Sequence, residues 1–217
     1  MIEYVARYHG RLFAAFGQHL LILLVTMTVS LVLAVLLTLF LHRKGRKAER
    51  AGLRIAGAVY AVPSLALFAL LIPVLGLGMR TAVFVLVLYN QFLLVRNFLA
   101  GFNAVPAPLV EAGNGMGMTW MQVVVMVKVP LSLPVIIAGI RLAVVSTIGI
   151  GTIAAVINAG GIGSILFDGL RTNNAVKIVW GAILCAVLAL GANAALLRLE
   201  TFARKTTGNH ESSDVST

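Results

Sequence analysis

Residues 20–41 read LLILLVTMTVSLVLAVLLTLFL, a run of 22 residues that contains no charged side chain. An α-helix rises about 1.5 Å per residue and the hydrocarbon core of a bilayer is about 30 Å thick, so about 20 such residues span it. The run exceeds the roughly 7–15 apolar residues of a signal peptide, and no small-residue cleavage site follows it. This stretch therefore predicts a membrane-spanning helix that stays in the protein as an anchor.

Four further stretches have the same character, namely Ile55–Leu75, Thr81–Leu99, Leu131–Ile157 and Ile178–Leu197. Of the 217 residues in the chain, 60% are hydrophobic and 11% are charged. Soluble domains contain about 45–50% apolar and about 25% charged residues, so the composition excludes an ordinary soluble domain. The sequence predicts an all-α polytopic membrane protein with five transmembrane helices, whose membrane domain covers residues 20–197.

The basic residues indicate how this protein is oriented in the membrane. The chain has 17 Lys and Arg against 7 Asp and Glu, a net charge of +10 that in a soluble protein would suggest a nucleic-acid partner. Here the basic residues lie between the apolar stretches, so no nucleic acid is expected. One side of the membrane collects eleven of them: Arg43, Lys44, Arg46, Lys47, Arg50, Arg54, Arg96, Lys128, Arg198, Arg204 and Lys205. The other side has five: Arg7, Arg11, Arg80, Arg171 and Lys177. Because the richer side faces the cytoplasm, we expect the N-terminus outside and the C-terminus inside.

Two more polar segments flank the membrane domain. Residues 1–19 mix aromatic and basic side chains, which is typical of a short helix in the extracytoplasmic membrane interface. A disordered leader is the alternative. Residues 198–217 form a predicted cytoplasmic tail, and its Ser/Thr-rich part from residue 206 onward is expected to be disordered.

The chain lacks the residues of common catalytic and ligand sites. No Lys follows a Gly, so there is no Walker A phosphate loop, and ATP would have to act through a partner. The four His residues are scattered without metal-ligand spacing, and Cys185 is the only cysteine. Neither a metal site nor an intrachain disulfide is therefore expected. We predict that the chain is not an enzyme and holds no cofactor of its own.

Charges are nearly absent from the predicted spans. All seven acidic residues fall outside them, whereas proton- or sodium-coupled carriers usually keep an acid in the membrane. Apart from Arg96, three residues before the end of the third span, Arg141 is the one charged residue within a span, about 12 Å along the helix from Leu133. It either snorkels toward the cytoplasmic interface or finds a partner in an assembled complex, so we expect it to matter for assembly. A secondary carrier or channel that works alone stays the alternative class.

A polar segment separates the third and fourth spans on the predicted cytoplasmic side, and residues 105–120 in it read VPAPLVEAGNGMGMTW. Pro106 and Pro108 can start a helix, in whose first turn Glu111 would favour the dipole. Gly115 and Gly117 can end it. The expected short helix on the membrane surface presents apolar side chains, namely Leu109, Met116, Met118, Trp120 and Met121. Such a surface suits either lipid headgroups or docking to another protein.

The spacing in this segment resembles a known signature. Glu111-Ala112-Gly113, three residues, Gly117, nine residues and then Val127-Lys-Val-Pro130 is similar to the EAA–x3–G–x9–I–x–L–P signature of permease subunits of type I ABC importers. Gly113 stands where Ala is usual, and valines stand where Ile and Leu are usual. Gly113 is expected to weaken the helix by roughly 0.5–1 kcal/mol relative to Ala. That family keeps the signature on the cytoplasmic side, in agreement with the orientation expected from charge.

Further stretches resemble permeases that import osmoprotectants such as glycine betaine, carnitine or choline. They are Tyr60–Pro73, Leu88-Tyr89 with Val95–Asn97, AGGIG at 159–163 and ILFDGL at 165–170. Methionine and other amino-acid permeases are similar in the signature and in the Gly-Gly-x-Gly stretch, and they stay the alternative. The resemblance implies the five-span all-α fold of the methionine-permease type, in a bacterial cytoplasmic (inner) membrane.

The resemblance also implies partners and site residues. In that family two permease subunits, identical or homologous, enclose the pathway within membrane lipid. Two ATPase subunits bind below with ATP and Mg, and an extracytoplasmic solute-binding protein delivers solute above. Residues 105–121 would contain the helix that couples to the ATPase. The coupling residues implied are Glu111, Ala112, Gly113, Met116, Gly117, Met118 and Pro130.

Polar or amphipathic residues near the spans are the candidates for the pathway: Tyr60, Ser64, Tyr89, Asn90 and Asn158. The ring faces of Tyr60 and Tyr89 could attract a quaternary ammonium solute by cation–π interaction, worth roughly 0.5–2 kcal/mol each. The alternatives are interfacial anchoring by the Tyr residues and hydrogen bonding between helices by the Asn residues.

Overall fold

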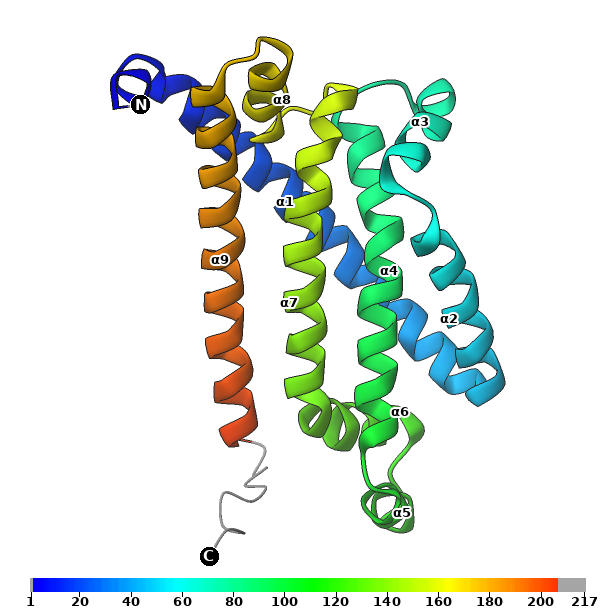
Figure 1. The fold of residues 1–217 in the computed structure, drawn as a ribbon. Coiled ribbons are helices and arrows are strands. Elements are labelled where there is room, and N and C mark those ends of the chain that lie inside the picture. Colours follow the sequence, from blue (N-terminus) through cyan, green and yellow to red (C-terminus); the bar gives the residue numbers. More distant parts are fainter. Residues whose placement is uncertain (1, 207–217) are drawn as a thin grey trace, which may run out of the picture.

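The computed structural model describes residues 2–206, and in this part of the chain all regular secondary structure is helical. The predicted all-α fold is confirmed. Figure 1 shows α9, α7 and α4 standing side by side, with α1 crossing behind them. The elements are α1 (Ile2–Lys44), α2 (Arg46–Ala61), α3 (Ser64–Leu75), α4 (Met79–Ala104), α5 (Ala107–Gly115), α6 (Trp120–Gln122), the π-helix η1 (Val123–Lys128), α7 (Val129–Ile153), the 3-10 helix η2 (Ala154–Ile157), α8 (Gly163–Arg171) and α9 (Ala175–Thr206). Disorder was predicted from residue 206 onward. Residue 206 is instead the last residue of α9, and residues 207–217 lie outside the described residues.

Helix α1 is longer than the predicted first span. It runs from Ile2 to Lys44 without a break at residue 19, and only Tyr8 has non-helical dihedral angles (φ −121°, ψ 17°). No proline interrupts this stretch, and buried Leu12 and Ala15 pack against Ile165 of α8. The chain kinks at Tyr8, and from His9 onward the expected interfacial segment continues into the first span as one helix.

The second predicted span is bent into two helices. Helices α2 and α3 meet at 91° across the break at Val62 and Pro63. A proline disfavours helical backbone at the residue before it, and Val62 is accordingly extended (φ −69°, ψ 130°). The predicted span Ile55–Leu75 is therefore a bent pair of helices, broken at Pro63. By length and apolarity, four of the described helices can cross a membrane, or five if the bent pair counts as one span.

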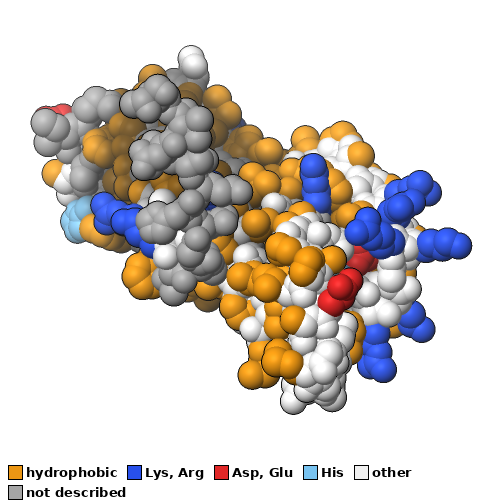
Figure 2. Space-filling model, turned by 90° about the horizontal axis from the view of Figure 1, so that it is seen from below, with side chains coloured by type: hydrophobic (Ala, Val, Ile, Leu, Met, Phe, Trp, Pro, Cys, Tyr) orange, Lys and Arg blue, Asp and Glu red, His pale blue; other side chains and the backbone are white. Residues whose placement is uncertain are grey.

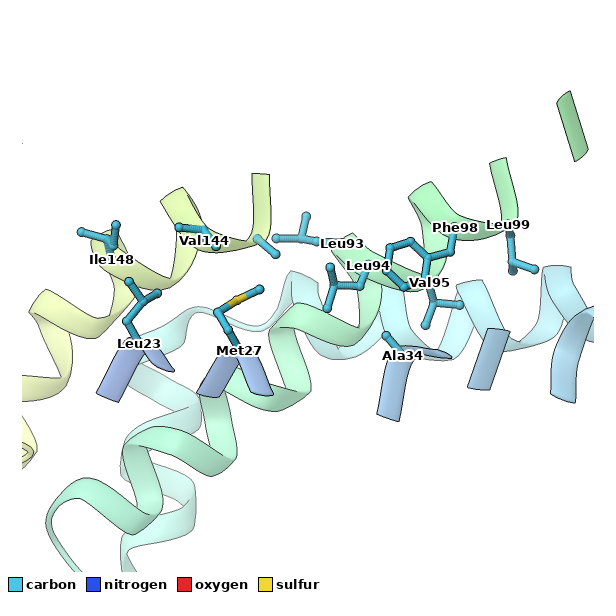
Figure 3. Close-up of a cluster of buried hydrophobic side chains, with 11 residues drawn as sticks. Leu23, Met27, Ala34, Leu93, Leu94, Val95, Phe98, Leu99, Val144 and Ile148 are labelled. Carbon is cyan, nitrogen blue, oxygen red and sulfur yellow. The ribbon is translucent and has the colours of Figure 1, made fainter. Parts of the chain in front are cut away.

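Helix α4 forms the centre of the bundle and packs on α1, α2, α3 and α7. Figure 3 shows the largest cluster of this core, with residues from three helices: Leu23 and Met27 of α1, Leu93, Leu94 and Phe98 of α4, and Val144 and Ile148 of α7. Helices in lipid associate through close packing, because lipid tails are as apolar as the side chains themselves. The fit between helix surfaces therefore decides the stability of the bundle.

Gly139 allows α7 to approach α4 closely. A Cβ atom added there would lie 2.5 Å from the Cβ of Asn97. We expect Gly139→Ala to destabilise the protein by about 1–3 kcal/mol, the usual cost of overpacking, and to lower its melting temperature in mild detergent. Gly149→Ala in the same helix is the control, since a Cβ there meets nothing within 4 Å. Equal melting temperatures for the two variants would contradict this view of the α4–α7 contact.

The two ends of the bundle are different in character. The start of α1 and helix α8 lie at one end, whereas α5, α6 and the last residues of α9 lie at the other (Figure 1). Figure 2 shows this second end face-on, with Lys and Arg side chains gathered on one part of it. The junction of α1 and α2 contributes the exposed Arg43, Lys44, Arg46 and Lys47. We name this whole end of the bundle, with α5, α6 and the last residues of α9, the basic end.

Candidate functional site

The 105–121 segment projects from the basic end (Figure 1), and its first half is the helix α5. Pro106 is extended (φ −57°, ψ 133°) and precedes the helix, while Pro108 lies in its first turn. Because α5 starts at Ala107, Glu111 is its fifth residue, and the first turn contains no acid. The expectation that Glu111 favours the dipole from the first turn is therefore wrong, and its side chain is exposed on the second turn.

A tight turn at Gly117 ends α5. The Met118 N–H donates to the carbonyl of Gly113 (3.1 Å), and the Gly117 N–H donates to the carbonyl of Asn114 (3.0 Å). This pair of hydrogen bonds is the Schellman motif, which requires a left-handed residue after the helix, and Gly117 supplies it with φ +80°. Gly113 is buried, and a Cβ there would lie 3.3 Å from the Met118 sulfur. The signature usually has Ala at this position, and Gly113 stands here where Met118 packs closely against the helix.

A second helix starts directly after the turn. The Thr119 hydroxyl accepts from the Gln122 N–H, and Oε1 of Gln122 accepts from the Thr119 N–H (2.7 Å), which forms a capping box. The helix continues through η1 into α7. Pro130 has no N–H, and its ring would clash with a carbonyl four residues earlier in a regular α-helix; the wider π turn of η1 precedes it. The 105–121 segment is therefore joined rigidly to α7.

Apolar side chains cover the outside of the 105–121 segment. Leu109, Met116, Trp120 and Met121 are all exposed, and Met116 reaches 72%. Met118 is half-buried against Gly113 instead of facing outward, while Ala112 is exposed beside Glu111. An exposed apolar group of this kind at the end of a helix pair is suited to contact with another protein.

A part-buried polar cluster, which sequence reasoning missed, lies beneath this segment. Nδ1 of His42 lies 2.7 Å from Oε1 of Glu49, and Nε2 of His42 lies 2.7 Å from Nζ of Lys128. Nδ2 of Asn103 donates to Oε2 of Glu49 (2.9 Å). The Trp120 ring lies 6.4 Å from that of His42. The sequence feature that could have pointed to this cluster is Gly45. Its φ of +90° turns the chain between α1 and α2, and the turn brings His42 and Glu49 together.

The structure separates the predicted pathway residues into different surroundings. Tyr89 is buried, its hydroxyl donates to the carbonyl of Val62, and its ring meets that of Tyr60 edge-on at 5.5 Å. Asn90 is buried as well, and its amide donates to the hydroxyls of Thr147 (3.0 Å) and Ser30 (3.3 Å). These contacts match the alternative of hydrogen bonding between helices.

The remaining pathway candidates lie nearer to surfaces. Tyr60 is half-buried, with its ring 5.1 Å from that of Phe92, and Ser64 is half-buried at the start of α3. Asn158 is exposed in a left-handed conformation (φ 62°) and lines a cavity of about 490 Å³ near α8. The structure therefore brings Tyr60 and Tyr89 together at the break between α2 and α3, and it keeps Asn158 apart in the cavity near α8.

Arg141 has a partner within the same chain. Its Nε donates to Oε2 of Glu200 (3.1 Å), and a terminal nitrogen donates to Oδ1 of Asn193 (3.1 Å). Glu200 is 5% exposed at its side chain and also accepts from Arg204 (2.9 Å). Helix α9 continues past its predicted end at Leu197, so Glu200 belongs to the same helix as the fifth span. The sequence left open snorkelling or a partner in an assembled complex, and within the described residues the partners of Arg141 are Glu200 and Asn193.

The comparison with known families decides what kind of protein this is. The family described as "Binding-protein-dependent transport system inner membrane component" matches residues 30–205. The chain belongs to this family. Members that resemble this permease include the glycine betaine/carnitine/choline transport system permease protein OpuCB of Bacillus subtilis (strain 168), 34% identical over 88% of this chain and 87% of that protein. The carnitine transport permease protein OpuCB of Listeria monocytogenes is 39% identical over 84% of each chain. The osmoprotectant import permease protein OsmW of Salmonella typhimurium is 35% identical over 92% and 94%.

Solved structures with the same fold include a chain of the MetNI methionine ABC transporter in an inward-facing form. The TM-score is 0.83 at 21% identity, over 91% of the permease and 98% of that chain. A chain of an amino-acid ABC transporter with histidines has a TM-score of 0.74 at 14% identity. The predicted methionine-permease type of fold is confirmed. The relatives are transport permease subunits, which are not enzymes themselves, and permeases of ABC importers work with an ATPase and a binding protein.

An ionic cluster holds the opposite end of the permease together. Asp168 of α8 accepts from Lys177 of α9 (2.9 Å), from Arg11 of α1 (3.1 Å) and from Arg171 (3.2 Å). The hydrogen bonds from Lys177 and Arg171 lower the pKa of Asp168 to about 2, so its carboxylate stays charged at physiological pH. Within residues 2–206, no three His, Cys, Asp or Glu side chains gather so that they could hold a metal ion.

Proposed function

We propose that this permease imports a compatible solute of the glycine betaine, carnitine or choline type. The observation that carries the proposal is that relatives 34–39% identical over most of both chains are named for such solutes. The likeness to a methionine transporter has only 21% identity and concerns the fold alone. A methionine or other amino-acid permease is the alternative, and an ATP-independent carrier or channel is the alternative from a different class.

The energy for import comes from partner subunits in this proposal. Two ATPase subunits bind ATP and Mg, since the chain itself has no Walker A loop, and an extracytoplasmic binding protein delivers the solute. A second permease subunit, identical or homologous, completes the pathway. The exposed Leu109, Met116, Trp120 and Met121 of the 105–121 segment support its role as the surface that meets the ATPase.

The basic end faces the cytoplasm of a bacterial cell in this proposal. The positive-inside rule supports it, because the junction of α1 and α2 and the end of α9 carry most of the Lys and Arg. The N-terminus then lies outside and the C-terminus inside. The ATPase subunits would meet the 105–121 segment from the cytoplasmic side, and α8 would face the binding protein.

The aromatic group at the break in the second span is the proposed contact for a quaternary ammonium solute. Tyr60 is half-buried, the Tyr89 ring meets its ring edge-on, and the Phe92 ring lies 5.1 Å away at an interplanar angle of 31°. A cation near the face of such a ring gains roughly 0.5–2 kcal/mol. Tyr60 therefore stays the principal candidate, and Tyr89 acts by fixing Tyr60 in place.

Competition uptake tests the solute class. We expect unlabelled glycine betaine, carnitine or choline to block uptake of a labelled member of this group in cells that rely on this importer, because the site accepts a quaternary ammonium group. Methionine at the same concentration is the control and should have little effect. Uptake that only methionine blocks would overturn the solute class and leave the family assignment untouched. Absence of an ATPase subunit from the permease purified in mild detergent would favour a carrier.

A further inference from the structure

The cluster of Lys128, His42, Glu49 and Asn103 joins four elements beneath the 105–121 segment. Its members come from η1, α1, α2 and α4 in that order. The side chains of His42 and Glu49 are each 9% exposed. A buried ion pair is weak evidence for stability, because well-packed apolar residues often serve equally well. The connection of four elements at one point favours a role in fixing their relative positions.

The partners of His42 define which ring nitrogen donates. An ammonium group can only donate, so Nε2 of His42 accepts from Lys128. Nδ1 then donates to the carboxylate of Glu49, which can only accept. Both oxygens of Glu49 are satisfied, since Asn103 donates to the second one. A directed chain of hydrogen bonds thus runs from the ammonium group through the imidazole to the carboxylate.

Lys128 ties this chain of hydrogen bonds to the 105–121 segment. It is the last residue of η1, which packs on α5 through Val123 and Val127 beside Gly113. The Trp120 ring also lies beside His42, and Arg43 lies 5.9 Å from the centre of the same ring. A displacement of α5 would therefore carry Lys128 and Trp120 with it.

Helix α2 lies at the other end of the chain of hydrogen bonds. Glu49 is in its first turn, and the helix runs for 16 residues, about 24 Å, to Ala61. The next residue, Val62, accepts from the hydroxyl of Tyr89 at the break before Pro63. One rigid helix therefore spans from the polar cluster to the aromatic group at the break.

We propose that the Lys128–His42–Glu49 chain makes α2 move together with the 105–121 segment. Movement that a partner ATPase imposes on the segment then reaches the break at Val62 and Pro63, where α2 and α3 change their angle. His42 and Glu49 are positioning residues, because they act through α2 and touch no solute. The inference rests on the proposed function, since it requires a driven segment and a pathway.

The test compares Glu49→Gln with the parental importer as a purified complex in liposomes. Gln keeps the shape and can still accept from Asn103, but it removes the charge that holds Lys128 and His42 in line. We expect solute uptake to fall about fivefold while ATP hydrolysis changes less than about twofold, because the ATPase works against a segment that no longer moves α2. A merely structural role would lower both rates in proportion to the amount of complex.

Two more variants make the test specific. Lys128→Met cuts the chain of hydrogen bonds at its other end, and the double variant with Glu49→Gln should be no worse than either single one, since both break one unit. Arg50→Gln removes an exposed charge from α2, one residue beyond Glu49, and should match the parental ratio of uptake to hydrolysis. The labelled solute is the one that the parental importer takes up in the competition experiment, methionine included. A different solute would therefore overturn the solute class and leave this test unchanged.

Two results would overturn the inference. The first is an unchanged ratio of uptake to hydrolysis in both Glu49→Gln and Lys128→Met. The second is loss of the assembled complex in both variants, which would mean that the cluster serves folding alone.

Discussion

Replacing Gly117 by Val is expected to abolish solute uptake while the permease stays in the membrane at nearly its parental level. Gly117 has φ +80°, a conformation that a β-branched residue adopts only with strain of roughly 1–3 kcal/mol. The two hydrogen bonds of the Schellman turn, from Gly117 to Asn114 and from Met118 to Gly113, would then be lost. The end of α5 would no longer be fixed against η1. No spanning helix contains this position, so insertion should proceed as before.

The measurement is uptake of the labelled solute together with the amount of permease in isolated membranes. Gly115→Val is the matched control, because Gly115 lies two residues earlier, is exposed, has no positive φ, and a Cβ there meets nothing within 4 Å. It should keep most of the uptake. If Gly117→Val inserts normally and transports at the parental rate, the 105–121 segment does not couple to an ATPase. A loop that rests on lipid headgroups would then be the better description.

Long apolar stretches and proline positions made much of this fold predictable. Leu20–Leu41 and Thr81–Leu99 lie within α1 and α4, because about 20 apolar residues can form little else in a membrane. The turn at Gly117 was predictable for a local reason, since Gly is the residue that accepts a left-handed cap. A proline such as Pro63 disfavours helical backbone at the residue before it, but the residue type does not give the angle of 91° between α2 and α3.

Contacts between distant helices were not predictable in the same way. The pairs His42–Lys128 and Arg141–Glu200 join residues 86 and 59 positions apart, and no local pattern marks them. His42, Lys128 and Glu200 lie where apolar stretches end, so hydropathy assigned them to the aqueous boundary, whereas Arg141 lies within a predicted span. The surroundings of Asn90 were equally hidden, because hydroxyls from two other helices, Ser30 and Thr147, surround its amide.

Replacing Arg141 by Ala is expected to reduce the amount of intact permease and leave the apparent affinity for solute nearly unchanged. Glu200 is 5% exposed, and removal of Arg141 leaves its buried carboxylate with Arg204, whose side chain is 59% exposed. Loss of one partner from a fully buried ion pair costs about 3–5 kcal/mol and an exposed partner contributes about 0–1 kcal/mol, so the loss of Arg141, 31% exposed at its side chain, should fall between these limits. Arg204→Ala is therefore the control and should have a much smaller effect.

A second substitution separates the cause from a general packing defect. Glu200→Gln in the Arg141→Ala background removes the unbalanced charge, so the double variant should recover part of the lost protein, as measured by size-exclusion chromatography in mild detergent. The KM for solute uptake, measured on the remaining protein, should stay near the parental value because Arg141 binds α7 to α9 through Glu200 and Asn193. A large rise in KM at a normal amount of protein would instead mean that Arg141 contacts the solute, and the ion pair with Glu200 would then be part of the pathway.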